Sequence, residues 1–151
     1  MGIGHPPDWR RARTLALDTS AFIYHLEAHP TRASRLLPIF RQIEAGRCRG
    51  VSSTLTFLEV LVQPYRTGDD DKRAALSALL ASFPGITWVP LDLAVADRAA
   101  SLRARYRLRT PDAIQVATAL HASAEVFLTN DRDLRRVEEA PVLLIDECGN
   151  R

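Results

Sequence analysis

The sequence predicts an α/β protein with three α/β/α layers, in which helices cover both faces of a five-stranded parallel sheet. Short apolar runs recur along the chain and stop abruptly, which is typical of buried parallel strands. Helical stretches separate nearly every pair of these runs, and strands that are joined through helices form parallel sheets. The length of 151 residues, with 46% hydrophobic and 25% charged residues, suits a single domain.

Each expected strand is a short apolar run. The first covers residues 15–17 and stops at Asp18. The other four are expected at residues 48–52, 86–91, 126–129 and 142–145. Helical periodicity with start or stop signals places helices at residues 21–26, 34–45, 54–64, 69–83, 93–106 and 112–122. We expect Thr19 or Ser20 to cap the first helix, and Thr110, which is followed by Pro111, to cap the last.

The two ends of the chain fall outside this pattern. Residues 1–13 contain two prolines and two glycines without periodicity, so we expect a flexible N-terminal arm there. A single domain then spans residues 14–146, and residues 147–151 form a short C-terminal tail.

Composition and charge exclude several classes of protein. The 20 basic and 18 acidic residues leave a net charge of +2, which is too balanced for a protein that coats polyanions. Cys48 and Cys148 have no C-x-x-C motif and no neighbouring histidine, so we expect neither a zinc site nor a disulfide framework. No segment reaches the roughly 18 consecutive apolar residues of a membrane span. A cytoplasmic protein without a membrane partner fits these observations.

Carboxylates follow two of the expected strands. Asp18 lies directly after the first strand, and Asp131 follows the fourth in the sequence VFLTNDRDL. Parallel α/β sheets bind ligands outside the carboxyl ends of their strands. Asp112 adds a third carboxylate, because it occupies the first turn of a helix that begins at the same edge if the winding is regular.

Glu59 is the fourth candidate, in the otherwise apolar helical segment TFLEVLV with no Lys or Arg within a turn. An unpaired carboxylate is costly to bury, and a cation removes that cost. Carboxylates that converge repel one another, whereas one or two Mg²⁺ or Mn²⁺ ions turn the repulsion into coordination. Such a site orients a phosphodiester and activates a water for in-line attack. The four acids are therefore candidates for metal-assisted phosphodiester hydrolysis.

Three of these acids also have purely structural explanations. Asp18 can cap a helix, Asp112 can stabilise a helix dipole and Asp131 can shape an Asn-Asp turn. Glu59 has no comparable structural role. The combination of two acids at strand ends with one inside an apolar helix favours the functional interpretation.

Three segments resemble the PIN-domain ribonucleases, and most closely the small VapC-like toxins of bacterial toxin–antitoxin pairs. They are LALDTSAFIYHLE, TLTFLEVLVQPYR and RTPDAIQVATALHASAEVFLTNDRDL, and the likeness runs from residue 14 to residue 145. The order Asp, Glu, Asp, Asp is matched together with its local surroundings. The resemblance implies the strand order 3-2-1-4-5, cleavage of single-stranded RNA, a cognate antitoxin protein and a homodimer.

The resemblance also implies roles for individual residues. The implied ligands of Mg²⁺ or Mn²⁺ are Asp18, Glu59, Asp112 and Asp131. Ser20 and Thr129 match hydroxyl residues that orient carboxylates or water. Asp133 falls near the same cluster, although a solvated turn residue explains it as well.

Arginines flank two of the proposed ligands. Arg109 precedes Asp112, and Arg132 and Arg135 follow Asp131. Contacts with RNA phosphates are one explanation. The other explanation is that these arginines are solvated charges on helix faces. Arginine makes up 19 of the 20 basic residues of the chain, and a GC-rich genome would by itself favour arginine.

Three other functions match part of the pattern. A phosphoacceptor receiver module also has acids at strand ends, but it needs a lysine at a strand end, and Lys72 follows three aspartates at a helix start. A PIN scaffold that binds RNA or protein without cleavage would not require all four acids. An RNA-processing nuclease without an antitoxin would keep the same chemistry.

Overall fold

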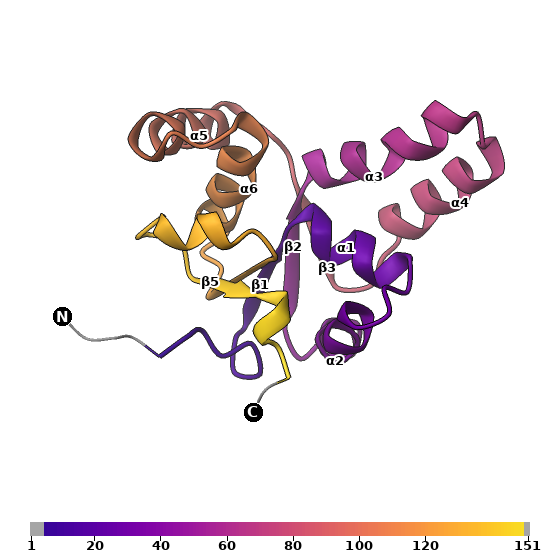
Figure 1. Ribbon diagram of the computed structural model, residues 1–151, viewed down its shortest axis with the longest axis horizontal. Coiled ribbons are helices and arrows are strands. Elements are labelled where there is room, and N and C mark those ends of the chain that lie inside the picture. The colour runs from indigo at the N-terminus through magenta and orange to yellow at the C-terminus, as the bar shows by residue number, and fades with distance from the viewer. Residues whose placement is uncertain (1–4, 150–151) are drawn as a thin grey trace.

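A computed structural model describes residues 5–149. Five parallel strands form one sheet in the order β3-β2-β1-β4-β5 (Figure 1). The strands are β1 (Thr14–Leu17), β2 (Arg49–Ser53), β3 (Ile86–Val89), β4 (Val126–Thr129) and β5 (Val142–Leu144). The predicted fold class and strand order are therefore confirmed.

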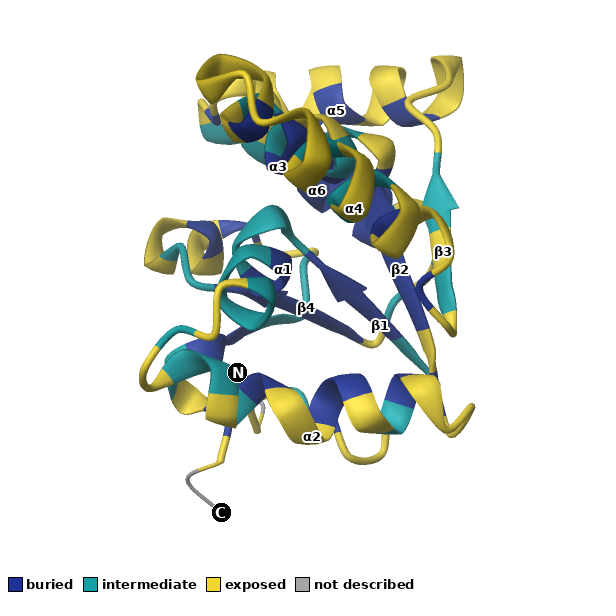
Figure 2. Cartoon of the chain, turned by 90° about the vertical axis from the view of Figure 1, so that its right-hand side faces the viewer, coloured by how far each residue is buried: buried dark blue, intermediate teal, exposed yellow. Residues whose placement is uncertain are grey.

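Helices cover both faces of the sheet. They are α1 (Thr19–Leu26), α2 (Arg32–Glu44), α3 (Thr54–Thr67), α4 (Asp70–Ala81), α5 (Leu93–Tyr106) and α6 (Thr110–His121), with 3₁₀ helices η1 (Arg132–Arg136) and η2 (Ile145–Glu147). In Figure 2, α2 lies on one side of the buried strands, and α5 and α6 lie on the other. Within the described residues, no helix is long and apolar enough to cross a membrane.

The alternation of side chains along β1 divides the core into two parts. Leu15 and Leu17 pack into the cluster that includes Phe22 of α1 and Phe40 of α2. Ala16 points to the opposite face and belongs to the cluster formed mainly by α5 and α6. Because both faces of the strand are buried, the sequence of β1 is a continuous apolar run that ends at Asp18.

Helix positions agree with the prediction to within a few residues, but two predicted caps are wrong. Asp18, not Thr19 or Ser20, caps α1, because the chain becomes helical directly after β1 and the side chain of Asp18 accepts from the Ala21 amide at 3.2 Å. Thr110 is already helical, so Arg109 occupies the N-cap of α6, and its side chain makes no capping bond.

The described part of the expected N-terminal arm packs against the domain. Trp9 and Ala12 are 7% and 5% exposed and belong to the core. The carbonyl of Trp9 accepts from Gln42 Nε2 at 3.2 Å, and the Arg13 amide donates to Glu125 at 2.9 Å. The expected flexibility is thus wrong for residues 9–13, because one large buried aromatic anchors a segment that lacks periodicity. Residues 1–4 lie outside the described part.

We predict that Trp9→Ala lowers the free energy of unfolding by about 3–5 kcal/mol, the usual cost of removing a buried aromatic side chain. Urea unfolding followed by circular dichroism measures this effect. Pro6→Ala, at an exposed position of the same segment, is the matched control and should change stability little. Equal stabilities for both variants would show that the segment does not contribute to the core.

Candidate active site

The four predicted acids lie in segments that meet around the carboxyl edge of the sheet. Asp18 follows β1 directly and Asp131 follows β4, and these strands are neighbours that pair Leu17 with Leu128. The Asp18 amide donates to the carbonyl of Leu128 at 3.1 Å, so the pairing continues to the first acid. Glu59 lies on α3, which follows β2, and Asp112 lies in the first turn of α6.

Asp18 is held by hydrogen bonds from neighbouring hydroxyl and amide groups. Its Oδ1 accepts from the Ser20 hydroxyl and from the Ala21 amide. Burial raises the pKa of Asp18 from 3.8 to about 6, although hydrogen bonds from Ser20, Thr129 and Ala21 act in the opposite direction. The ion pairs of the described residues do not include Asp18. The raised pKa is the expected property of a largely desolvated acid that has no basic partner among the described residues.

Thr129 connects the acids of the two central strands. Its side chain is buried, with a hydroxyl that donates to Asp18 and accepts from the Asp131 amide at 3.1 Å. Asp131 in turn caps η1, because its Oδ1 accepts from the Asp133 amide at 3.0 Å. The side chain of Asp133 is exposed and pairs with Arg136 at 3.1 Å. Ser20 and Thr129 therefore contact Asp18, whereas Asp133 contacts Asp131 through its backbone, and their role in supporting metal ligands stays a prediction.

A buried polar network supports Glu59. The Thr19 hydroxyl donates to Glu59 Oε1 at 2.7 Å. Gln115 Nε2 donates to the hydroxyls of Thr19 and Thr56 at 3.2 and 3.0 Å, and the Ser52 hydroxyl lies 3.1 Å from that of Thr56. Ser52, Thr56 and Gln115 were not among the site residues predicted from the sequence. Their one signal was a polar residue within an apolar stretch, such as the glutamine in AIQVATAL.

Asp112 has a basic partner one turn earlier in the chain. Arg109 Nε donates to Asp112 Oδ2 at 3.0 Å. The pKa of Arg109 is raised by this hydrogen bond and by the charge of Asp112, with further contributions from the charges of Asp131 and Glu59. Arg109 therefore lies within the field of three of the four acids. This is the observation that relates Asp112 and Glu59 to the strand-end acid Asp131.

The donor set suits a hard divalent cation, because all four residues offer carboxylate oxygens. Yet among the described residues, no group of three or more His, Cys, Asp or Glu side chains lies close enough to hold a metal ion. Each acid instead bonds to a hydroxyl, an amide or Arg109 nearby. The chemistry of the site fits Mg²⁺ or Mn²⁺, and coordination by all four residues requires their side chains to turn toward one another.

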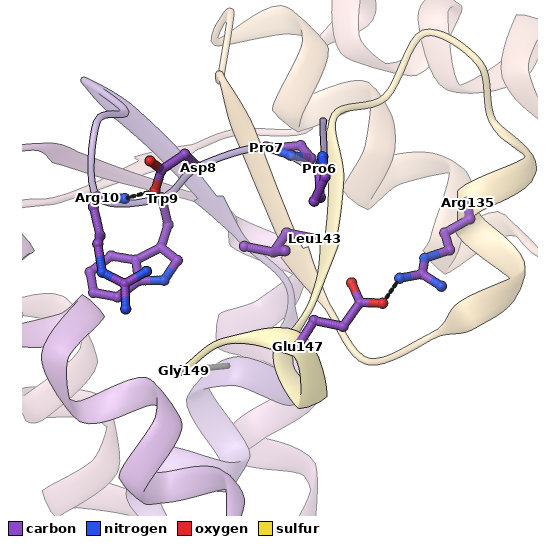
Figure 3. A pocket seen from close by; sticks show the side chains of 9 residues that line it. All are labelled: Pro6, Pro7, Asp8, Trp9, Arg10, Arg135, Leu143, Glu147 and Gly149. Atoms are coloured by element: carbon purple, nitrogen blue, oxygen red, sulfur yellow. Dashed lines mark hydrogen bonds and ion pairs between the residues drawn. The ribbon is translucent and has the colours of Figure 1, made fainter. Parts of the chain in front are cut away.

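The predicted RNA-binding arginines after Asp131 face acids near the C-terminus. Arg135 pairs with Glu147, and Figure 3 shows this pair beside a cavity of about 560 Å³ that Pro6 and Trp9 also line. The charge of Arg132 contributes to the lowered pKa of Asp146, whose main cause is a hydrogen bond from Arg32. A role of Arg132 and Arg135 in RNA binding stays a prediction.

The fold and the carboxylates at its edge define an α/β domain with an acidic site at a parallel sheet. Residues 15–140 match the model of the PIN domain family, and the chain belongs to this family. PIN domains are generally nucleases, which hydrolyse phosphodiester bonds. No curated protein sequence matches the chain.

Several solved structures share this fold. VapBC2 from Rickettsia felis, bound to a DNA fragment from its promoter, has a TM-score of 0.71 at 12% identity over 87% of this chain and 98% of that chain. VapBC-1 from nontypeable Haemophilus influenzae has a TM-score of 0.69 at 15% identity over 89% and 99%. A toxin–antitoxin complex from Klebsiella pneumoniae has a TM-score of 0.62 at 24% identity over 87% and 97%. At these identities the likeness establishes the fold.

We predict that Asp18 makes the chain less stable as the pH rises from about 4 to about 6 in the presence of EDTA. The folded chain retains the proton of Asp18 up to a pKa of about 6, whereas an unfolded chain loses it near pH 4. The folded state therefore binds more protons in this window, and the free energy of unfolding decreases with pH by at most about 3 kcal/mol. Urea unfolding at a series of pH values measures this change.

Asp18→Asn should remove this pH dependence, so the stability of the wild type relative to the variant should decline between pH 4 and pH 6. Asp97→Asn, at an exposed position of α5, is the control and should follow the wild type. A difference between wild type and Asp18→Asn that stays constant with pH would contradict the raised pKa.

Proposed function

We propose that this chain is a metal-dependent endoribonuclease that cleaves single-stranded RNA and acts in the cytoplasm as the toxin of a toxin–antitoxin pair. The observation that carries the proposal is Asp18, a partly buried carboxylate that forms no ion pair among the described residues and is joined to Asp131 through the hydroxyl of Thr129. Membership of a family of nucleases supports the reaction class. The toxin–antitoxin complexes among the structural neighbours support the biological role.

In this proposal Asp18, Glu59, Asp112 and Asp131 hold the cation. Mg²⁺ or Mn²⁺ would stabilise charge on the transferring phosphate and lower the pKa of the attacking water. Ser20 and Thr129 fix the orientation of Asp18, and Thr19 fixes that of Glu59. The buried amide of Gln115 holds Thr19 in turn, so that the carboxylates lie on a preorganised support.

We predict that the purified chain cleaves end-labelled single-stranded RNA in Mg²⁺ or Mn²⁺ and that EDTA abolishes cleavage. Asp112→Asn should reduce the rate by at least about 100-fold, because loss of groups that merely support a metal ligand already costs 10–100-fold. Asp97→Asn removes an exposed carboxylate from α5 and should retain wild-type activity. Gel electrophoresis of the products measures both rates.

The result of this experiment also separates the alternatives. Cleavage that persists in EDTA or in Asp112→Asn would overturn the four-carboxylate mechanism. Absence of cleavage together with RNA binding would favour a non-catalytic PIN scaffold. Metal-dependent cleavage by a chain that has no protein inhibitor would favour an RNA-processing nuclease.

The surface of α3 offers a docking site for the proposed antitoxin. Leu58 and Tyr65 are 58% and 64% exposed and line an apolar hollow of about 550 Å³ together with Phe57, Leu61 and Val62. Large apolar side chains gathered on one helix are typical of protein interfaces. A homodimer is also part of the proposal, and Leu93 of α5, which is 89% exposed, is a candidate for its interface.

We predict that the tagged chain, expressed from its native operon, co-purifies with a small protein that suppresses RNA cleavage. Leu58→Glu should weaken this complex at least about tenfold, because a charge would be buried in an apolar interface. Leu37→Glu, at a position of α2 that is 38% exposed, is the matched control and should retain the partner. A chain purified without any bound protein would contradict the toxin–antitoxin role.

A further inference from the structure

Arg109 is a cation placed inside the acidic edge of the sheet. It occupies the N-cap of α6, three residues before Asp112, and its Nε donates to Asp112 Oδ2 at 3.0 Å. The side chain is 80% exposed, and its only hydrogen bond within the described residues is the one to Asp112. Arg109 makes no capping bond for α6, so its contact with Asp112 is not required to start the helix.

The acid that contacts Arg109 is itself a proposed metal ligand. Asp112 is its hydrogen-bond partner, and the charges of Asp131 and Glu59 also act on its guanidinium. Of the ion pairs formed by the described residues, the pair of Arg109 with Asp112 is the one that involves a proposed ligand. Arg109 and a divalent cation would thus compete for the same negatively charged carboxylate.

The structure also shows the acids in an arrangement that does not yet form a metal site. No three acidic, histidine or cysteine side chains of the described chain lie close enough to hold an ion. In this arrangement Asp112 Oδ2 accepts from Arg109. For Asp112 to coordinate a cation through that oxygen, the guanidinium has to move away.

We propose that Arg109 is a resident counter-ion that occupies Asp112 in the metal-free chain and competes with the divalent cation for the acidic site. This inference rests on the proposed function, because it assumes that the cation binds these carboxylates. Arg109 acts as a positioning residue: it neutralises part of the acidic cluster before metal binding and releases Asp112 when the cation arrives. The chain would therefore bind its cation less tightly than its four acids alone allow.

The exposure of Arg109 limits the size of this effect. Ion pairs at the protein surface contribute at most about 1 kcal/mol, because water screens them. A factor of ten in affinity corresponds to about 1.4 kcal/mol, so removal of Arg109 should tighten cation binding by about two- to fivefold. The effect should decrease at high salt, where interactions between exposed charges are screened.

The test measures binding of Mn²⁺ to the purified chain without RNA, from the electron paramagnetic resonance signal of free Mn²⁺. Arg109→Gln should lower the dissociation constant about two- to fivefold. Arg109→Lys retains the positive charge and should stay near the wild-type value. Arg41→Gln, at an exposed position of α2, removes the same charge elsewhere and should leave the constant unchanged. Thermal unfolding in EDTA verifies that each variant is folded.

A second measurement uses the unmodified chain. The ¹H–¹⁵N signal of Arg109 Nε–H reports the hydrogen bond to Asp112. Titration with Mg²⁺ should move this signal toward its position in Asp112→Asn, where the carboxylate partner is absent. A signal that does not move while Mg²⁺ binds would overturn the inference.

The outcomes for this inference and for the proposed function are distinct. If Mn²⁺ binds the wild type and Arg109→Gln with the same constant, or binds the variant more weakly, Arg109 is not a competitor, and the nuclease proposal still stands. If Mn²⁺ binds neither protein, both proposals fail. If Mn²⁺ binding is detected for Arg109→Gln but not for the wild type, Arg109 prevents binding of the cation, which supports the inference.

Discussion

The parallel pairing of β1 with β4 is the constraint on which the candidate site depends. It places the last residues of two strands side by side, with Leu17 opposite Leu128 and the Asp18 amide bonded to the Leu128 carbonyl. Parallel strands all end at the same edge, so acids that follow them are brought together although more than 100 residues separate them in the sequence. The apolar packing on both faces of β1 fixes this register, because a shift by one residue would exchange the two faces.

The hydroxyl network beneath the acids is the second level of organisation. Thr129 contacts two carboxylate residues, and Thr19 connects Glu59 to the buried amide of Gln115. In a buried environment such groups are costly unless every polar atom finds a partner, and here they form a continuous set of bonds. The network joins α3 and α6 to Thr19 at the start of α1, the residue after Asp18, and thereby relates the position of Glu59 to that of Asp18.

Periodicity was sufficient to predict the strands, the helices and their parallel layered arrangement, whereas the strand order was implied by the resemblance to the PIN-domain ribonucleases. The acids became candidates because of their positions after strands or within an apolar helix. The strands and helices follow from local signals, because each is buried along a face that the sequence displays. Trp9 was missed, since one aromatic residue in a stretch of prolines and charges gives no periodic pattern. Gln115 and Thr56 were missed for a different reason: their role is to bond to residues from other elements, and only the packing of α6 against β1 and α3 brings these partners together. Arg109 was predicted to contact RNA phosphates. Only the three-dimensional arrangement shows that its guanidinium forms an ion pair with Asp112.

The structural and functional explanations of the acids turn out to be compatible. Asp18 caps α1, as its structural explanation requires, and Asp131, which was explained as part of an Asn-Asp turn, caps η1. Each of these bonds uses one oxygen of a carboxylate. Asp131 caps η1 through Oδ1, and Glu59, which is not a cap, accepts from Thr19 through Oε1. Among the described residues, no hydrogen bond involves Oδ2 of Asp131 or Oε2 of Glu59. A bond that holds one oxygen leaves the other accessible, so under the proposed function the structural role of each acid and its role as a metal ligand use different oxygens.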